Sequence, residues 1–161
     1  MSIHKLLTFA CILTGTLFLG CGPERPAGMP KIYPCTIEVT MNGEPQTEAV
    51  VHLMPDDGSK WYAGGTTGTD GKVKLATLAE YKGVAEGTYH VSILKPVDDP
   101  NWKPKKNFDG VLETEPGWTS LYDLTYANPA TTPLTCTVVA GKNSFEFDMK
   151  ENMLIKSSSK K

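Results

Sequence analysis

The sequence predicts an all-β protein: a seven-stranded, antiparallel-rich β-sandwich with a long aromatic-containing excursion before its last two strands. Three observations predict this class. Apolar residues recur at every second position in short segments, Asn-Gly and Asp-Gly turns separate several of these segments, and no stretch between them has the length and period of a helix. Many short strands joined by turns are typical of two packed sheets.

The predicted strands follow one another through the body of the chain. In the first, four apolar residues from Cys35 to Met41 alternate with Thr and Glu, and Asn42-Gly43 ends the strand. Asp70-Gly71 marks a later hairpin turn, and the stretch 140–143 separates the last two strands. The predicted strands cover residues 35–41, 49–54, 61–67, 72–76, 88–94, 134–138 and 145–149.

The N-terminal segment predicts export. An apolar run of about 14 residues, from Leu6 to Leu19, follows the cation Lys5 and stops at Cys21. A membrane-spanning helix needs about 20 apolar residues, whereas a secretory signal needs a basic start and about 7–15. The length of the run therefore favours a signal over a membrane span.

The end of this run predicts lipid attachment. Gly20-Cys21 resembles the bacterial lipoprotein signal, in which the cysteine becomes the acylated first residue of the mature protein, although Phe18 replaces the leucine that is usual there. The resemblance implies that Cys21 carries fatty acids such as palmitate. The alternative is an uncleaved signal anchor with an incidental cysteine, since Cys11 lies in the same run.

Lipidation would place the protein outside the cytoplasm and hold it to a membrane. One acyl chain alone gives only marginal binding, so stable attachment takes more than one chain. Gly22 follows the cysteine, where lipoproteins retained in the inner membrane usually have Asp. By that resemblance, the outer membrane is favoured in a cell with two membranes.

The chain divides into four predicted parts. Residues 1–20 form the signal peptide that is removed, and residues 21–34 form a lipidated tether with four prolines and two glycines. Residues 35–150 form the sandwich domain, and residues 151–161 form a polar C-terminal tail.

Composition argues against a nucleic-acid partner. The formal net charge is −2, and no run of like charge is longer than two residues. Arg25 is the only arginine and lies in the tether. Because nucleic-acid sites favour the guanidinium group, we predict that the folded domain binds none.

Two cysteines remain for the domain, Cys35 and Cys136, once the signal is removed and Cys21 is acylated. Both occupy core-facing positions of predicted strands. An even pair in an oxidising compartment predicts a disulfide, which would close a loop of about 100 residues and contribute up to ~4.7 kcal/mol in the chain-entropy model. The alternative is two unlinked buried thiols.

Four segments together resemble a known family. They are VTMNGEPQTEAVVHLMP, TGTDGKVKL, GTYHVSI and YANPATTPLTCTVVAGKNSFEFDM, they follow one another in this order, and the resemblance covers about residues 36–149. Their order and spacing resemble the carboxypeptidase-regulatory-like domain, a transthyretin-like sandwich common in bacterial surface lipoproteins. The resemblance implies that the first and next-to-last strands are sheet neighbours, which would bring Cys35 and Cys136 within reach. It implies no common reaction.

No catalytic constellation is visible in the sequence. His52 and His90 lie on strand faces opposite the core residues, and Ser120 lacks a nucleophile-elbow pattern. We therefore predict no enzyme activity, no metal and no cofactor. Two alternatives stay open: a small hydrolase with its site in residues 97–132, which mutation of Ser120 or His90 would test, and a carrier of a small apolar ligand.

The excursion over residues 97–132 is the most informative feature for function, because long connections are uncommon and often functional. A short helical turn is predicted from Thr119 or Ser120 through Leu124. Its aromatic side chains would stack on sugar rings or dock a protein; the alternative is that most of them fold back over an open end of the sandwich. The aromatic residues are Trp102, Phe108, Trp118, Tyr122 and Tyr126.

We select Trp102 and Trp118 as the candidate ligand-binding residues of this excursion. Together with the predicted anchor, they indicate a non-catalytic binding or structural role in the cell envelope. The predicted partners are the membrane, through the N-terminal lipid, and an envelope protein or polysaccharide. The sequence does not indicate an oligomeric state.

Overall fold

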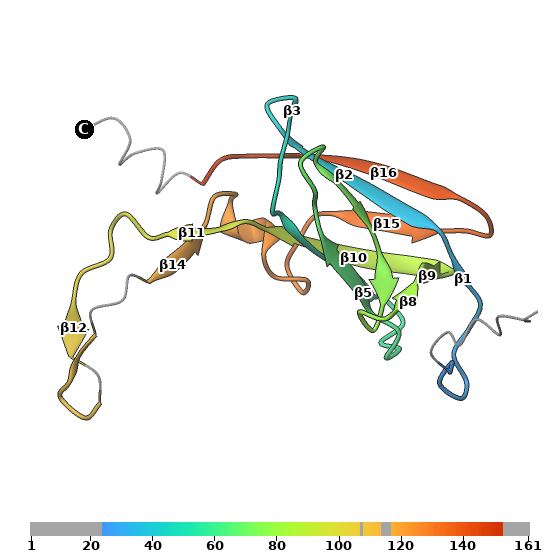
Figure 1. The fold of residues 1–161 in the computed structure, drawn as a ribbon, viewed down its shortest axis with the longest axis horizontal. Coiled ribbons are helices and arrows are strands. Elements are labelled where there is room, and N and C mark those ends of the chain that lie inside the picture. The colour runs from blue at the N-terminus through green and yellow to red at the C-terminus, as the bar shows by residue number, and fades with distance from the viewer. Residues whose placement is uncertain (1–23, 107, 114–116, 153–161) are drawn as a thin grey trace, which may run out of the picture.

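A computed structural model of the protein describes residues 24–106, 108–113 and 117–152, which form two packed β-sheets without an α-helix (Figure 1). The predicted all-β class is therefore confirmed. The signal peptide at 1–20, Cys21 and residues 153–161 of the predicted tail lie outside the described residues. Among the described residues, no helix is long and apolar enough to cross a bilayer.

The larger sheet has six strands in the order β15-β10-β4-β5-β7-β8. All of its neighbouring strands are antiparallel. The strands are β4 (Val50–Pro55), β5 (Ala63–Thr66), β7 (Ala76–Thr77), β8 (Tyr81–Lys82), β10 (Gly87–Leu94) and β15 (Thr135–Val138).

The smaller sheet is built around β2 (Cys35–Met41). One edge of β2 pairs with β6 (Lys72–Lys74) and β3 (Glu44–Pro45). Its other edge pairs with the last strand, β16 (Asn143–Met149), in parallel along its whole length. The sandwich is thus antiparallel-rich but contains one parallel pair.

The strand neighbours implied by the family resemblance are wrong for this chain. The first long strand, β2, pairs with the last strand, β16, whereas the next-to-last strand, β15, pairs with β10 in the other sheet. The chain changes sheets in the turn between β15 and β16. There the Asn143 side-chain amide donates to the carbonyls of Val139 at 2.9 Å and Gly141 at 3.1 Å, which closes the turn.

The core lies between the two sheets and follows the predicted alternation. Ile37 and Val39 of β2, and Leu53 and Val91 of the larger sheet, are fully buried. Each such side chain contributes roughly 1.5–3 kcal/mol when it leaves water. Each of the seven predicted segments contains a strand, and further short strands occur between them.

The predicted tether is partly packed against the sandwich. Within it, β1 (Ile32–Tyr33) pairs with β9 (Val84–Ala85), which precedes β10. Gly83 allows this close approach, because a Cβ there would lie 2.8 Å from the Tyr33 carbonyl oxygen. At the C-terminal side, Asn152 is buried and its backbone N–H donates to the Leu121 carbonyl at 2.8 Å.

The predicted excursion contains short ordered elements. They are β11 (Pro96–Asp98), β12 (Lys105–Lys106), β13 (Leu112–Glu113), β14 (Trp118–Ser120) and the 3₁₀ helix η1 (Leu124–Tyr126).

The helical turn begins later than predicted. Thr119 and Ser120 belong to β14, where they pair with β11, so the prediction that the turn starts there is wrong. Asp123 caps η1 instead, because its side chain accepts a hydrogen bond from the Thr125 N–H at 2.9 Å. These bonds also lower the pKa of Asp123.

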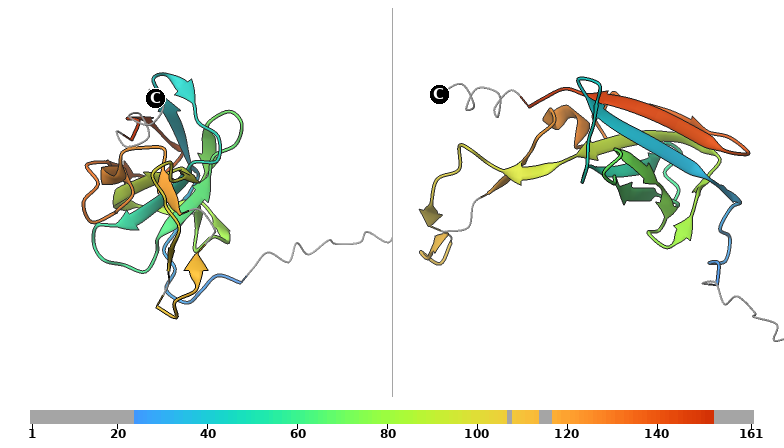
Figure 2. Two further views of the ribbon diagram at one scale, coloured as in Figure 1. Left: turned by 90° about the vertical axis from the view of Figure 1, so that its left-hand side faces the viewer. Right: turned by 45° about the horizontal axis from the view of Figure 1, so that its top comes forward.

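Part of the excursion projects from the sandwich. We call residues 99–118, apart from 107 and 114–116, the arm. Figures 1 and 2 show it at one end of the long axis, while the N-terminal segment from residue 24 lies at the opposite end. We call that opposite end the tether end.

Candidate functional site

A two-stranded ribbon carries the arm away from the sandwich. β11 leaves the larger sheet directly after β10 and pairs with β14, with Val97 opposite Thr119. The Asp99 N–H extends the ribbon by donating to the Gly117 carbonyl at 2.8 Å. Beyond it, β12 and β13 pair as a second hairpin, so the arm has a hydrogen-bonded backbone near its far end.

The two candidate tryptophans have different surroundings. Trp102 is half-buried and packs on Gly117, where an added Cβ would lie 2.6 Å from the Trp102 Cδ1 atom. Trp118 is 69% exposed. Trp118 is therefore accessible to a ligand, whereas Trp102 holds the two sides of the arm together.

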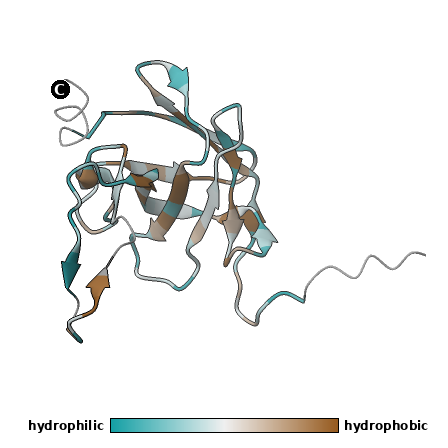
Figure 3. Ribbon diagram, turned by 60° about the vertical axis from the view of Figure 1, so that its left-hand side comes forward, coloured by the Kyte–Doolittle hydropathy of each residue, from teal (hydrophilic) through white to brown (hydrophobic). Residues whose placement is uncertain are grey.

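The far end of the arm exposes further apolar side chains. Phe108 is fully exposed and Leu112 is 52% exposed. In Figure 3 the strand with Lys105 and Lys106 is hydrophilic, and its partner β13 contributes the apolar Leu112. Phe108 is among the candidate contact residues named from the sequence, but Leu112 is not. The short apolar pair Val111-Leu112 in a polar stretch could have indicated this second exposed residue.

The remaining aromatic residues of the excursion fold back into the sandwich. Tyr122 is fully buried and Tyr126 is 8% exposed, and both belong to the main hydrophobic core. Burial raises the pKa of Tyr122 to about 12. The alternative in which rings cap the sandwich is thus correct for these two tyrosines but not for Phe108 and Trp118.

Ser120, the candidate nucleophile of the hydrolase alternative, is buried. Its Oγ accepts hydrogen bonds from the backbone N–H groups of Tyr122 at 3.2 Å and Lys95 at 3.4 Å. Ser120 pairs with Pro96, which is six residues from His90 along an extended chain. Such a stretch spans about 20 Å, so the structure does not bring Ser120 and His90 together.

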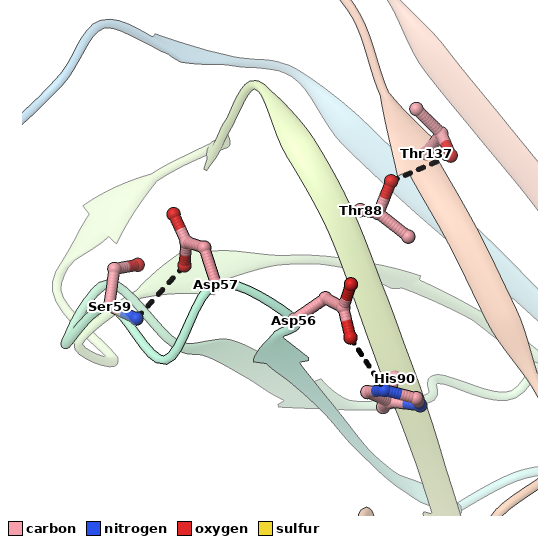
Figure 4. A network of polar contacts seen from close by, with 6 residues as sticks. All are labelled: Asp56, Asp57, Ser59, Thr88, His90 and Thr137. Atoms are coloured by element: carbon pink, nitrogen blue, oxygen red, sulfur yellow. Dashed lines mark hydrogen bonds and ion pairs between the residues drawn. The ribbon is translucent and has the colours of Figure 1, made fainter.

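His90 belongs to a different polar network, near the start of β10 (Figure 4). Its Nε2 atom lies 3.0 Å from Asp56 Oδ1, and the hydroxyls of Thr88 and Thr137 are 3.3 Å apart. Both histidine positions agree with the prediction that they face away from the core, since His52 is exposed and His90 half-exposed. These contacts tie the loop after β4, and β15, to β10.

An acidic hollow of about 530 Å³ lies beside this network, at the tether end. Asp56, Asp57 and Glu86 line it together with Trp61, and its lining includes no lysine or arginine. The Ser59 N–H donates to Asp57 Oδ1 at 2.9 Å. Within the described ranges, no group of three or more His, Cys, Asp or Glu residues is arranged to hold a metal ion.

The two domain cysteines lie in one core, on opposite sheets. Cys35 of β2 and Cys136 of β15 are both buried, and the structure gives them as free thiols. Burial raises the pKa of Cys35 to about 11 and that of Cys136 to about 12. Cys35 also adds to the rise at Cys136 through charge repulsion, so the two sulfurs are electrostatic neighbours.

Comparison with known proteins adds little to this description. No protein-family model matches the sequence, and no curated protein matches it. Among solved structures, the chain is similar to the major pilin subunit of Bacillus cereus, with 11% identity and a TM-score of 0.44 over 76% of this chain. The matched region spans 31% of the pilin subunit, and a likeness of this size establishes no function.

Proposed function

We propose that the protein is a lipid-anchored, extracytoplasmic binding module of the cell envelope, without a catalytic role. Its arm would contact an envelope protein or a polysaccharide. The observation that carries the proposal is the arm itself, which exposes Phe108, Leu112 and Trp118 at the end of the molecule opposite the tether.

The exposed residues of the arm have the chemistry of an interface. Single exposed apolar residues are normal on soluble proteins, but the arm carries several large ones on one projecting element, which favours a contact surface. Aromatic side chains are enriched at the centres of interfaces because they bury a large area for few rotatable bonds. Trp118 is well suited to this role because it lies on β14, which is paired to β11.

Lipid attachment at Cys21 supports the same arrangement. The apolar run ends at Cys21, and the described chain begins three residues later at the tether end. An anchor there would leave the arm directed away from the membrane, where a partner is accessible. We place the protein outside the cytoplasm on this basis, with the outer membrane favoured.

The two alternatives have less support from the described residues. A hydrolase would need Ser120 or His90 beside a partner group, yet Ser120 is buried against backbone N–H groups. A carrier of an apolar ligand would need a lined cavity, whereas the acidic hollow is bordered by exposed carboxylates such as Asp57 and Glu86. We therefore favour binding through the arm.

The test is site-specific photo-crosslinking in intact cells. A photoreactive amino acid replaces Trp118, and as a matched control it replaces Tyr62, an aromatic residue of the sandwich that is 48% exposed. We expect a discrete adduct from position 118 and none from position 62. Equal adducts from both positions would exclude the arm as the binding surface. So would the absence of an adduct from position 118 together with unchanged glycan binding by Trp118→Ala.

A further inference from the structure

A second hollow at the tether end has the opposite charge. It encloses about 690 Å³ between the start of β2, the β6–β8 region and the turn before β16. Lys74, Lys82 and Lys142 line it, with Glu80 as its one acidic residue. Apolar groups of Leu75 and other small residues complete the lining. We call this surface the lysine hollow.

The three ammonium groups of the lysine hollow have no partner in the described part of the chain. The ion pairs of Lys72 with Glu38 and of His90 with Asp56 involve none of these three lysines. Lys74, Lys82 and Lys142 are exposed and are held by neither a carboxylate nor a carbonyl. Three unpaired cations around an apolar surface favour an anionic, partly apolar ligand.

The tether passes between the two hollows, because Gly28 and Pro30 line the acidic hollow and Glu24 bonds to β8, which borders the lysine hollow. The Tyr81 hydroxyl donates to the Glu24 carbonyl at 2.8 Å, and Tyr81 lies between Glu80 and Lys82, which both line the hollow. Glu24 is three residues from Cys21. Three extended residues reach about 10 Å at most, so acyl chains on Cys21 would enter a bilayer close to both hollows.

The two hollows at the tether end would respond differently to a membrane. The acidic hollow, with Asp56, Asp57 and Glu86, is repelled by anionic lipid, whereas the lysine hollow is attracted. The difference selects one side of the tether end to face the bilayer. A domain held only by its lipid would otherwise rotate freely on the tether.

We propose that the lysine hollow docks on the anionic headgroups of the membrane that holds Cys21, and so orients the domain with its arm away from that membrane. The proposal rests on the proposed lipid anchoring and adds the surface that meets the bilayer. Each lysine near an anionic surface strengthens binding about fivefold, so three favour the docked orientation by about 100-fold.

The test uses residues 21–161, which contain both sheets and the whole core. The chain is coupled through Cys21 to a maleimide lipid in vesicles of phosphatidylcholine alone, or of phosphatidylcholine mixed with phosphatidylglycerol. Cys35 lines the lysine hollow, but Cys35 and Cys136 are only 3% and 6% exposed and burial raises both thiol pKa values, so the maleimide couples to Cys21 first. Lysine accessibility is then measured residue by residue, by amine acetylation and mass spectrometry.

We expect slower acetylation of Lys74, Lys82 and Lys142 on the anionic vesicles than on the neutral ones, with the difference lost at high salt. Lys103 and Lys106 on the arm should be acetylated equally on both. Equal acetylation of the hollow lysines on both vesicle types, or equal protection of the arm lysines, would overturn the proposal.

Matched variants show whether the lysine hollow drives the docking. Lys82→Gln should weaken the protection of Lys74 and Lys142 about fivefold, whereas Lys106→Gln, with the same loss of charge, should leave it unchanged. Equal effects of the two variants would contradict the proposal.

The intact mass of the native protein, extracted from membranes, tests the proposed acylation separately. Absence of acyl groups there would refute the anchoring and leave the chemically coupled docking result standing. Acylation without lysine protection would refute the docking alone.

Discussion

The excursion between β10 and β15 has two parts with similar aromatic content, but their aromatic side chains differ in burial. In the arm, Phe108 is fully exposed and Trp118 is 69% exposed. In residues 120–132, which we call the folded-back segment, Tyr122 is fully buried and Tyr126 is 8% exposed. Aromatic content therefore does not decide which side chains enter the core.

The difference lies in the backbone and side-chain hydrogen bonds available to each part. The folded-back segment is bonded to the sandwich: Thr132 Oγ1 donates to the Val91 carbonyl at 2.8 Å, and the Asp123 N–H donates to the Lys150 carbonyl at 2.9 Å. The arm extends from β11 and is paired within itself. Rings are buried where the neighbouring polar groups can also be satisfied.

The largest expected effect is oxidation of Cys35 with Cys136, which we retain as a proposal. A bridge would join the two sheets and enclose a loop of about 100 residues, with a contribution of up to ~4.7 kcal/mol to the free energy of unfolding. Hydrogen exchange should slow in the folded-back segment, which is bonded to the sandwich, and stay unchanged in the arm. Two alkylated thiols after unfolding without reductant would exclude the bridge.

A pair of truncations compares the two parts directly. Tyr122→Ala should lower the free energy of unfolding by about 3–5 kcal/mol, because it leaves a large cavity in the core. Trp118→Ala should change it by less than about 0.5 kcal/mol, because the ring is exposed. Urea denaturation followed by circular dichroism measures both changes. Similar losses of unfolding free energy in the two variants would mean that the arm is packed on the sandwich.

High pH should destabilise the sandwich, because its buried thiol and tyrosine hydroxyl groups keep their protons to a higher pH than in the unfolded chain. The pKa of Cys35 rises from 9.0 to about 11 and that of Tyr122 from 10.0 to about 12 on folding. The folded state therefore holds protons that the unfolded chain releases, and stability falls as pH rises. The loss should begin near pH 9 in the reduced protein, and nearer pH 10 if a bridge removes both thiols.

The same measurement distinguishes the two parts of the excursion. Denaturation midpoints recorded between pH 8 and pH 12 should fall in parallel for the native chain and for Trp118→Ala, because residue 118 lies outside the core that contains Cys35 and Tyr122. A midpoint that stays constant over this range would show that the buried thiols and tyrosines are more accessible than their burial implies.

The strands were predictable because their local pattern determines which face is buried. Alternation around Ile37 and Val39, and around Val91, leads directly to the inner faces of the two sheets. Strand pairing was not predictable in this way. The parallel pair of β2 with β16 follows a turn that the Asn143 side chain closes, and periodicity carries no information about that bond.

The candidate site was predictable only in part for a related reason. Trp102 and Trp118 look equivalent in the sequence, and Gly117 is the one local sign that a ring packs closely there. The burial of Tyr122 depends on hydrogen bonds between the folded-back segment and residues that are distant in the sequence, such as Val91. The lysine hollow brings together Lys74 and Lys142, which are far apart in the chain, so only the folded topology shows it.

The smallest expected effect, of about 1 kcal/mol, comes from removing single hydroxyls. In the described residues the buried Tyr122 hydroxyl has no hydrogen-bond partner, whereas the Tyr89 hydroxyl donates to the Ala85 carbonyl at 2.9 Å. Tyr122→Phe should therefore leave the free energy of unfolding unchanged or raise it, because an unpaired buried hydroxyl is costly. Tyr89→Phe should lower it by about 1 kcal/mol, because the carbonyl of Ala85 loses its partner.

Both variants keep the ring and its packing, so the comparison isolates the hydroxyl. Urea denaturation at neutral pH, where both hydroxyls are protonated, measures the two changes on one scale. A loss in Tyr122→Phe as large as that in Tyr89→Phe would mean that the Tyr122 hydroxyl is bonded, for example through a buried water. The folded-back segment would then be held by a polar contact at its centre as well as by the bonds at its two ends.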